Sequence, residues 1–280
     1  MKRRDKKPWV ISVASGKGGV GKTLTTVNMA IAAQRFGYKT LILDGDLGLA
    51  NVDIVLGLRG RYNINDVLEY RAELKDVLLE GPLGVHIIPS GSGINRLADM
   101  KLVQRVQLLD KVEEISGDYD VLVIDTGAGI SENVLHLNSV SDALMVVTTP
   151  EPHALADAYA FIKVMCEHHG KRDFHIVINQ VISESQGLKV FQRLTDITKR
   201  FLNLDLLFGG SVPKDVLIER SVMLQRAADE NITHTRSGQA WNEATRRVIE
   251  HLKERPRSEG ASGIRSLLFS HTNQRSAGAL

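Results

Sequence analysis

A glycine-rich run near the N-terminus has the spacing of a phosphate-binding loop. It extends from Gly16 to Thr23 and fits the pattern G-x-x-x-x-G-K-[ST]. Glycines let backbone N–H groups curl around phosphate oxygens with no side chain in the way. We expect Lys22 to reach the outer phosphates of a triphosphate and the Thr23 hydroxyl to bind Mg²⁺. The residues predicted to line the phosphates are Gly16, Lys17, Gly18, Gly19, Val20, Gly21, Lys22, Thr23 and Leu24.

Two carboxylates, Asp44 and Asp46, lie at the end of the next apolar segment. The segment from Lys39 to Asp44 is typical of a buried strand, and it continues through Gly45 to Asp46. In a parallel sheet, both carboxylates would reach the edge that carries the phosphate loop. We assign Asp46 to orienting the attacking water and Asp44 to the outer shell of the metal. The alternative for Asp46 is an acidic turn that caps the next helix, since Asp is common in turns.

A third carboxylate ends another apolar segment. Val121 to Asp125 is followed by Thr126-Gly-Ala-Gly129. Asp125 suits a position near Mg²⁺, and Gly129 suits a backbone N–H beside the γ-phosphate that moves on hydrolysis. The predicted metal-binding residues are therefore Thr23, Asp44 and Asp125.

Strand-like and helix-like segments alternate along the whole chain. Further strands are expected at 85–89, 119–125, 143–149 and 175–179, with a weaker one at 205–209; helices are expected at 22–35 and 154–168. Such alternation predicts an α/β fold with a mostly parallel, twisted sheet and helices on both faces. Ligands bind at the carboxyl ends of such strands, where the phosphate loop also lies. The sequence therefore predicts the P-loop NTPase fold.

Composition limits the class of protein. The chain has 280 residues and 43% hydrophobic content, enough for one substantial core. Its formal net charge of +2 gives little general attraction to nucleic acid or acidic lipid. The single cysteine, Cys166, excludes an intramolecular disulfide, and no segment has the features of a signal peptide or membrane span. We expect a cytoplasmic protein.

The second lysine of the loop carries a family resemblance. Lys17, within Gly16-Lys-Gly-Gly-Val-Gly-Lys-Thr23, resembles the deviant Walker A motif of the MinD/ParA ATPases. The resemblance implies ATP hydrolysis with Mg²⁺ and an ATP-bound homodimer in which Lys17 reaches the partner subunit's phosphates, much as an arginine finger does. The alternative is a solvated surface lysine. The catalytic residues implied are Lys17, Lys22, Asp46 and Asp125.

Longer stretches are similar to the flagellar-number regulators FlhG/FleN within this family. They are residues 44–58, 88–94, 125–135 and 149–160, and the resemblance covers roughly 9–250. It implies control of flagellar number or placement, with slow hydrolysis as a timer. The implied partners are an FlhF-like GTPase, flagellar switch or C-ring proteins, or a flagellar transcription regulator. The first eight residues do not match the family's FlhF-stimulating motif.

The resemblance also implies a base pocket. Asn179 ends a predicted strand and would hydrogen-bond adenine, while Pro213 and Asp215 would form the far wall. A strand-end Asn is also a good turn former, which is the alternative.

The two ends of the chain differ in composition from its middle. We divide the chain into a basic tail (1–8), an ATPase domain (9–254), a linker (255–263) and an end segment (264–280). Ile264, Leu267 and Leu268 recur at helical spacing. The family resemblance implies that this segment is a short amphipathic helix, which would place the dimer at the inner face of the cell membrane. The alternative is a disordered tail with a few apolar residues.

Rival functions share parts of this pattern. One is a MinD-like division-site or ParA-like partition ATPase, and another is a metal-cluster-loading ATPase. Nucleic acid is not expected as a partner, because no alternation of aromatic and basic residues marks a binding groove. A cluster carrier usually has paired cysteines, which one cysteine cannot supply.

Overall fold

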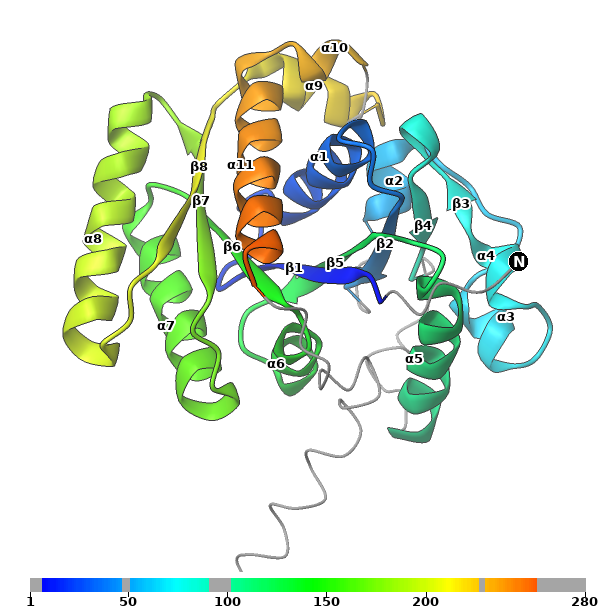
Figure 1. The fold of residues 1–280 in the computed structure, drawn as a ribbon. Helices are drawn as coiled ribbons and strands as arrows, with labels where there is room; N and C mark the ends of the chain where they lie inside the picture. Colours follow the sequence, from blue (N-terminus) through cyan, green and yellow to red (C-terminus); the bar gives the residue numbers. More distant parts are fainter. Residues whose placement is uncertain (1–6, 47–50, 91–101, 227–229, 256–280) are drawn as a thin grey trace, which may run out of the picture.

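The sheet at the centre of the molecule has eight strands. The computed structural model describes residues 7–46, 51–90, 102–226 and 230–255. The strand order is β3-β4-β2-β5-β1-β6-β7-β8, and Figure 1 shows the sheet between two layers of helices. The strands are β1 (Trp9–Ser15), β2 (Thr40–Gly45), β3 (Leu79–Glu80), β4 (His86–Ile88), β5 (Val121–Ala128), β6 (Ala143–Thr148), β7 (Phe174–Val181) and β8 (Leu207–Pro213). All neighbouring pairs are parallel except β3 and β4, which confirms the mostly parallel sheet.

Helices cover both faces of this sheet. They are α1 (Lys22–Arg35), α2 (Val52–Leu56), α3 (Ile64–Leu68), α4 (Leu74–Val77), the 3-10 turn η1 (Pro82–Gly84), α5 (Leu102–Ser116), α6 (Glu132–Ser139), α7 (Pro152–His169), α8 (Glu184–Leu202), α9 (Val216–Met223), α10 (Glu230–Thr233) and α11 (Arg236–Lys253). Helices α1 and α11 lie on one face, while α5, α6 and α7 lie on the other (Figure 1). The predicted α/β architecture is therefore confirmed.

The central strands are mostly apolar because both faces of the sheet are covered. In β5, Val121 and Val123 pack into the cluster under α1 and α11, whereas Leu122 and Ile124 pack into the cluster on the opposite face. Successive strand residues point to opposite faces, so a strand buried on both sides is mostly apolar, and its polar residues gather near the carboxyl end, as Asp125 and Thr126 do in β5. The same burial explains why these segments were recognisable from the sequence.

Several strands differ from the expectation, and β5, for example, covers 121–128 rather than 119–125. The last strand, β8, covers 207–213 rather than 205–209. It contains Gly209 and Gly210, and glycine weakens the sequence signal of a strand. A Cβ at Gly209 would lie 3.0 Å from the Ile176 carbonyl oxygen of β7, so the close approach of the two strands restricts this position to a small residue. The two-residue β3 was not predicted because it is too short to show a period.

The predicted end segments fall almost entirely outside the described residues. Residues 1–6 of the basic tail, 256–263 of the linker and the whole of 264–280 are among them. At the start of the predicted linker, the Arg255 guanidinium donates two hydrogen bonds to the Asp173 carboxylate.

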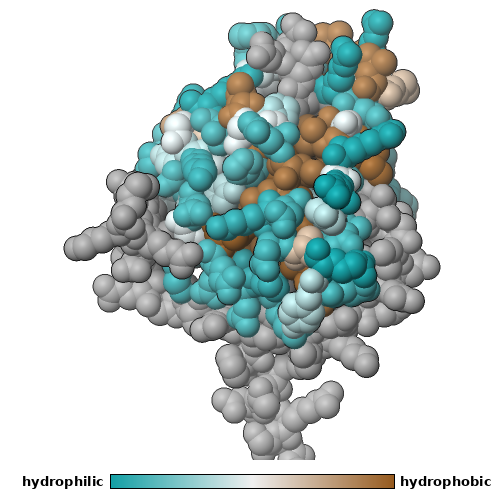
Figure 2. Space-filling model, turned by 90° about the vertical axis from the view of Figure 1, so that its right-hand side faces the viewer, coloured by the Kyte–Doolittle hydropathy of each residue, from teal (hydrophilic) through white to brown (hydrophobic). Residues whose placement is uncertain are grey.

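Apolar surface is present on one side of the molecule. Figure 2 shows it as brown atoms among hydrophilic ones, on the side where Figure 1 shows α2 and β3. Exposed apolar side chains of this region include Ile54 of α2 and Leu83 of η1. Patches of this kind are typical of contacts with other molecules.

Candidate nucleotide-binding site

The loop between β1 and α1 has a backbone that only glycine fits at two positions. Gly21 has φ +95°, and a Cβ there would lie 2.2 Å from the Asn179 Nδ2 atom. A Cβ at Gly16 would lie 2.1 Å from the backbone oxygen of Asp157 in α7. The neighbouring elements therefore exclude side chains from both ends of the loop.

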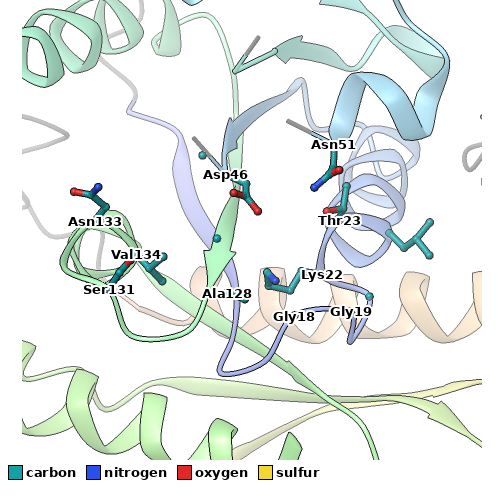
Figure 3. Close-up of a pocket in the computed structure, with 14 residues that line it drawn as sticks. Gly18, Gly19, Lys22, Thr23, Asp46, Asn51, Ala128, Ser131, Asn133 and Val134 are labelled. Atoms are coloured by element: carbon teal, nitrogen blue, oxygen red, sulfur yellow. The ribbon is translucent and has the colours of Figure 1, made fainter. Parts of the chain in front are cut away.

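A cavity of about 550 Å³ opens at this loop, on the carboxyl side of the strands. The phosphate loop and the start of α1 form one wall, and the end of β5 with the start of α6 forms the other (Figure 3). Backbone N–H groups at a helix N-terminus are an anion-binding arrangement, and the first turn of α1 contains no acidic residue. The lining residues are Gly18, Gly19, Gly21, Lys22, Thr23, Leu24, Gly45, Asp46, Asn51, Gly127, Ala128, Ser131, Asn133 and Val134.

Lys22 supplies positive charge to this cavity. It is the first residue of α1 and is 9% exposed. Burial lowers the pKa of its ammonium, while the charges of Asp125 and Asp46 act in the opposite direction. A phosphate in the cavity would favour the charged form further.

Asp125 and Thr23 meet as the predicted metal site requires. The Asp125 side chain is 1% exposed. Its Oδ2 accepts a hydrogen bond from the Thr23 hydroxyl at 2.7 Å, and its Oδ1 accepts one from the Thr26 hydroxyl at 3.0 Å. Burial raises the pKa of Asp125 to about 6, which a divalent cation beside it would counteract. A hydroxyl and a carboxylate are oxygen ligands of the kind that Mg²⁺ prefers, so these residues fit that ion.

Asp44 organises the segment that follows β2. It lies opposite Asp125 in the β2–β5 register and is fully buried. Its two oxygens accept backbone N–H groups from Asp46 at 3.1 Å, Asn51 at 3.1 Å and Val52 at 3.3 Å. Burial first, and then the charge of Asp125, raises the pKa of Asp44 to about 7. The predicted place of Asp44 in the outer shell of the metal stays a prediction.

Asp46 lines the cavity across from the phosphate loop (Figure 3). A Cβ at Gly127 would lie 3.7 Å from the Asp46 Oδ1 atom, so the carboxylate faces the end of β5. This position is compatible with the predicted role of orienting water at the outermost phosphate. That role stays a prediction.

Lys17 turns towards α7. Its ammonium donates a 2.8 Å hydrogen bond to the Glu151 carboxylate, and its side chain is 41% exposed. The hydrogen bond to Glu151 raises the pKa of Lys17, and the bond to Lys17 lowers that of Glu151. Lys17 is therefore a charged, accessible group at the rim of the site.

The residues predicted for the adenine pocket reach the same edge of the sheet. Asn179 donates from Nδ2 to the Val20 carbonyl oxygen at 2.8 Å and accepts from the Gln180 N–H at 2.9 Å, so it braces the phosphate loop. Pro213 ends β8, and Asp215 caps α9 by accepting the Leu217 N–H at 2.9 Å. Their contacts with adenine stay a prediction.

Sequence reasoning missed several residues of this site. Thr26 lies one turn after Thr23 on α1, so helical spacing alone was a usable signal. The residues around Glu151 gave no indication that it contacts the site, because its partner Lys17 lies 134 positions away in the chain. The cavity residues that were not foreseen are Gly45, Asn51, Gly127, Ala128, Ser131, Asn133 and Val134.

A parallel sheet with this loop, Lys22 and an Asp125–Thr23 contact defines a P-loop nucleoside-triphosphatase. The ParA family model, described as "NUBPL iron-transfer P-loop NTPase", matches residues 7–251. The chain therefore belongs to the ParA/MinD family of P-loop ATPases.

Two proteins similar to this chain belong to the flagellar regulators that the sequence resembles. The antiactivator FleN of Pseudomonas aeruginosa is 39% identical over 85% of this chain and 85% of its own length. The flagellum site-determining protein YlxH of Helicobacter pylori is 34% identical over 76% of this chain and 72% of its own.

Solved structures of MinD share the fold. MinD of Pyrococcus horikoshii, complexed with Mg-ADP, has a TM-score of 0.73 at 23% identity and covers 89% of this chain and 99% of its own. MinD in the MinC:MinD complex of Aquifex aeolicus has a TM-score of 0.70 at 27% identity. It covers 86% of this chain and 96% of its own length. Among the described residues of the present chain, no helix is long and apolar enough to cross a membrane.

Proposed function

We propose that this protein is an ATP-dependent dimerising switch ATPase that regulates flagellar number or placement. The observation that carries the proposal is the cavity lined by Lys22, Thr23 and Asp46, in which Thr23 also donates a hydrogen bond to the buried Asp125 carboxylate. The flagellar role is supported by the similarity to FleN and YlxH.

Each residue has a distinct role in the proposed reaction. Lys22 and the backbone N–H groups of the loop bind the phosphates of ATP, and Thr23 and Asp125 hold Mg²⁺. Bound Mg²⁺ would neutralise charge on the phosphate oxygens. Asp46 orients the attacking water in line with the leaving group, and Asp44 keeps the segment carrying Asp46 in place through its backbone contacts.

Lys17 acts between two subunits in this proposal. Leaving Glu151, its ammonium would reach the phosphates bound by the partner and stabilise the ATP-bound dimer. An exposed ion pair contributes little to stability, so the exchange of Glu151 for a phosphate is feasible. Loss of the γ-phosphate would remove the charge that Lys17 contacts and release the dimer.

The mass of the particle in solution tests this proposal. With ATP and Mg²⁺, we expect a dimer for the wild type, a trapped dimer for Asp46→Ala because hydrolysis stops, and a monomer for Lys17→Ala. Light scattering after size exclusion measures the mass, and an ADP sample gives the monomer reference. Lys189→Ala, at an exposed position of α8, is the matched control and should behave as the wild type. Wild-type behaviour of both site variants would contradict the assigned roles.

The proposed partners follow from the relatives. The name antiactivator, given to FleN, supports a flagellar transcription regulator as the first candidate. An FlhF-like GTPase and flagellar switch or C-ring proteins are the others. Membrane attachment through residues 264–280, at the inner face of the cell membrane, belongs to the same proposal.

The rival functions make different predictions. A division-site ATPase is compatible with the MinD fold, and a partition ATPase would retain DNA with ATP and lose it steeply as salt rises. The matched family model mentions iron transfer. Cys166 is the single cysteine of the sequence, so a paired-cysteine motif cannot form within one chain.

A further inference from the structure

A buried asparagine ties α6 to the strand that carries Asp125. Asn138 lies near the end of α6 and is fully buried. Its Nδ2 donates to the Thr126 hydroxyl oxygen at 3.3 Å and to the Val134 carbonyl oxygen at 2.7 Å. Thr126 directly follows Asp125 in β5, so one side chain bridges the helix and the site strand.

The strand is irregular at this place. In the β1–β5 register, Val13 pairs with Asp125 but Ser15 pairs with Ala128, so β5 has one extra residue between these positions. The Thr126 hydroxyl donates to the Val13 carbonyl oxygen at 2.9 Å within this irregularity. Such bulges commonly redirect a chain next to an active site. Here the chain turns into the loop that forms one wall of the cavity.

Helix α6 forms the rest of that wall. Its N-cap residue, Ser131, and two residues of its first turn, Asn133 and Val134, all line the cavity (Figure 3). A Cβ at Gly127 would lie 3.1 Å from the Val134 Cγ2 atom, and 3.7 Å from the Asp46 Oδ1 atom. The position of α6 therefore determines how close the wall comes to Asp46.

Asn138 is an unfavourable choice for packing alone. Its Oδ1 atom is buried and has no hydrogen-bond partner among the residues that the structure describes. A buried, unsatisfied acceptor destabilises the folded state, and an apolar side chain of similar volume would avoid that cost. Buried polar groups without a full set of hydrogen bonds concentrate at functional sites.

We propose that Asn138 is a positioning residue for hydrolysis. Through the Thr126 hydroxyl, its amide keeps α6 and the bulge of β5 in one arrangement, so that Gly127 and Val134 confine the Asp46 carboxylate and the attacking water. This inference rests on the proposed ATPase function and on the role of Asp46. It assigns a task to two residues that touch neither the phosphates nor the metal-binding oxygens.

Steady-state hydrolysis of ATP by four variants tests the inference. Asn138→Leu removes the bridge but leaves the Thr126 donor on Val13, so no new donor is orphaned. We expect kcat to fall about tenfold while KM for ATP stays within about a factor of two, because misplacement affects the reacting geometry rather than phosphate binding. Thr126→Val should lower kcat similarly, and Thr126→Ser should restore it because the hydroxyl remains. The double variant Asn138→Leu/Thr126→Val should be no slower than the slower single variant.

A distant buried hydroxyl provides the control for stability. Thr198 in α8 is equally buried, and its Oγ1 lies 3.1 Å from the carbonyl oxygens of Thr195 and Leu204. Thr198→Val should lower the melting temperature without lowering kcat. A wild-type kcat in Asn138→Leu and Thr126→Val would overturn the inference and leave the proposed function intact. The inference would also be overturned if, across all variants, kcat fell only in proportion to the fall in melting temperature. A wild-type protein without ATP hydrolysis would overturn both.

Discussion

Two buried carboxylates at neighbouring strand ends dominate the electrostatics of the site. Asp44 and Asp125 are register partners in β2 and β5, and burial raises their pKa values to about 7 and about 6. Lys22 is the cation that the structure places beside Asp125. A second cation at Thr23 and Asp125 would relieve the repulsion between the carboxylates. The arrangement suits a site that binds Mg²⁺ together with a polyphosphate.

At the residue scale, Asp44 makes the stability of the ligand-free protein depend on pH. Its carboxyl keeps a proton up to about pH 7 in the folded state but loses it near pH 4 when unfolded. The folded state therefore binds more protons in this window, and the free energy of unfolding falls as pH rises through it. We expect Asp44 to contribute a decrease on the order of 2 kcal/mol between pH 5 and pH 8 in chelator-treated protein. Buried His175, whose pKa is lowered to about 4, contributes a change of opposite sign below about pH 6.5, so the contribution of Asp44 is the difference between wild type and a variant that lacks this carboxyl. Urea unfolding at both values measures it.

The matched variants separate Asp44 from other carboxylates. Asp44→Asn cannot ionise, so its free energy of unfolding should fall less between the two pH values than that of the wild type. Asp125 and His175, which act in opposite directions, determine what remains. Asp196→Asn, on the exposed face of α8, should keep the wild-type difference. An unchanged difference in Asp44→Asn would show that this carboxyl does not carry the effect.

At the scale of elements, the junction between the phosphate loop and α1 depends on one left-handed residue. Gly21 is the N-cap of α1, and Asn179 of β7 occupies the space a side chain would need. Asn179 in turn donates to the Val20 carbonyl oxygen. Strand β7 therefore sets the position of the loop even though it contributes no residue to the described cavity lining.

Gly21→Ala should consequently weaken both folding and nucleotide binding. A positive φ at a residue with a Cβ costs about 1–3 kcal/mol, and the new Cβ would also push Asn179 from the loop. Gly117→Ala is the control, because a Cβ there would have no atom of the described residues within 4 Å. Chemical unfolding and titration with a fluorescent ADP analogue measure the two effects. Equal results for both variants would refute the role assigned to Gly21.

At the scale of the whole molecule, the proposed switch combines a dimer with a membrane segment outside the described residues. A segment of about two helical turns binds a bilayer weakly alone, and two linked copies bind much more tightly. We expect the wild type to sediment with anionic liposomes in ATP but not in ADP. Deletion of residues 263–280 should abolish that sedimentation while leaving the ATP-dependent mass unchanged. Unchanged sedimentation would remove the end segment from the proposal.

Much of this protein was readable from local patterns. Lys22 and Thr23 follow from the spacing of the loop, and Asp125 follows from an apolar strand that ends in a carboxylate. These signals work because a phosphate needs consecutive backbone N–H groups, and because parallel strands bring their carboxyl ends to one edge. Strands buried on both faces are apolar, so the alternation of elements was also visible.

The tertiary structure decided which side chains meet. Thr26 lies 99 positions from Asp125, Lys17 lies 134 positions from Glu151, and Asn138 reaches Thr126 only because α6 folds back onto β5. Such contacts depend on how helices pack on the sheet and on a single bulge in β5, which shifts the register by one residue. The local sequence does not indicate which distant residues meet, because these contacts depend on packing throughout the core.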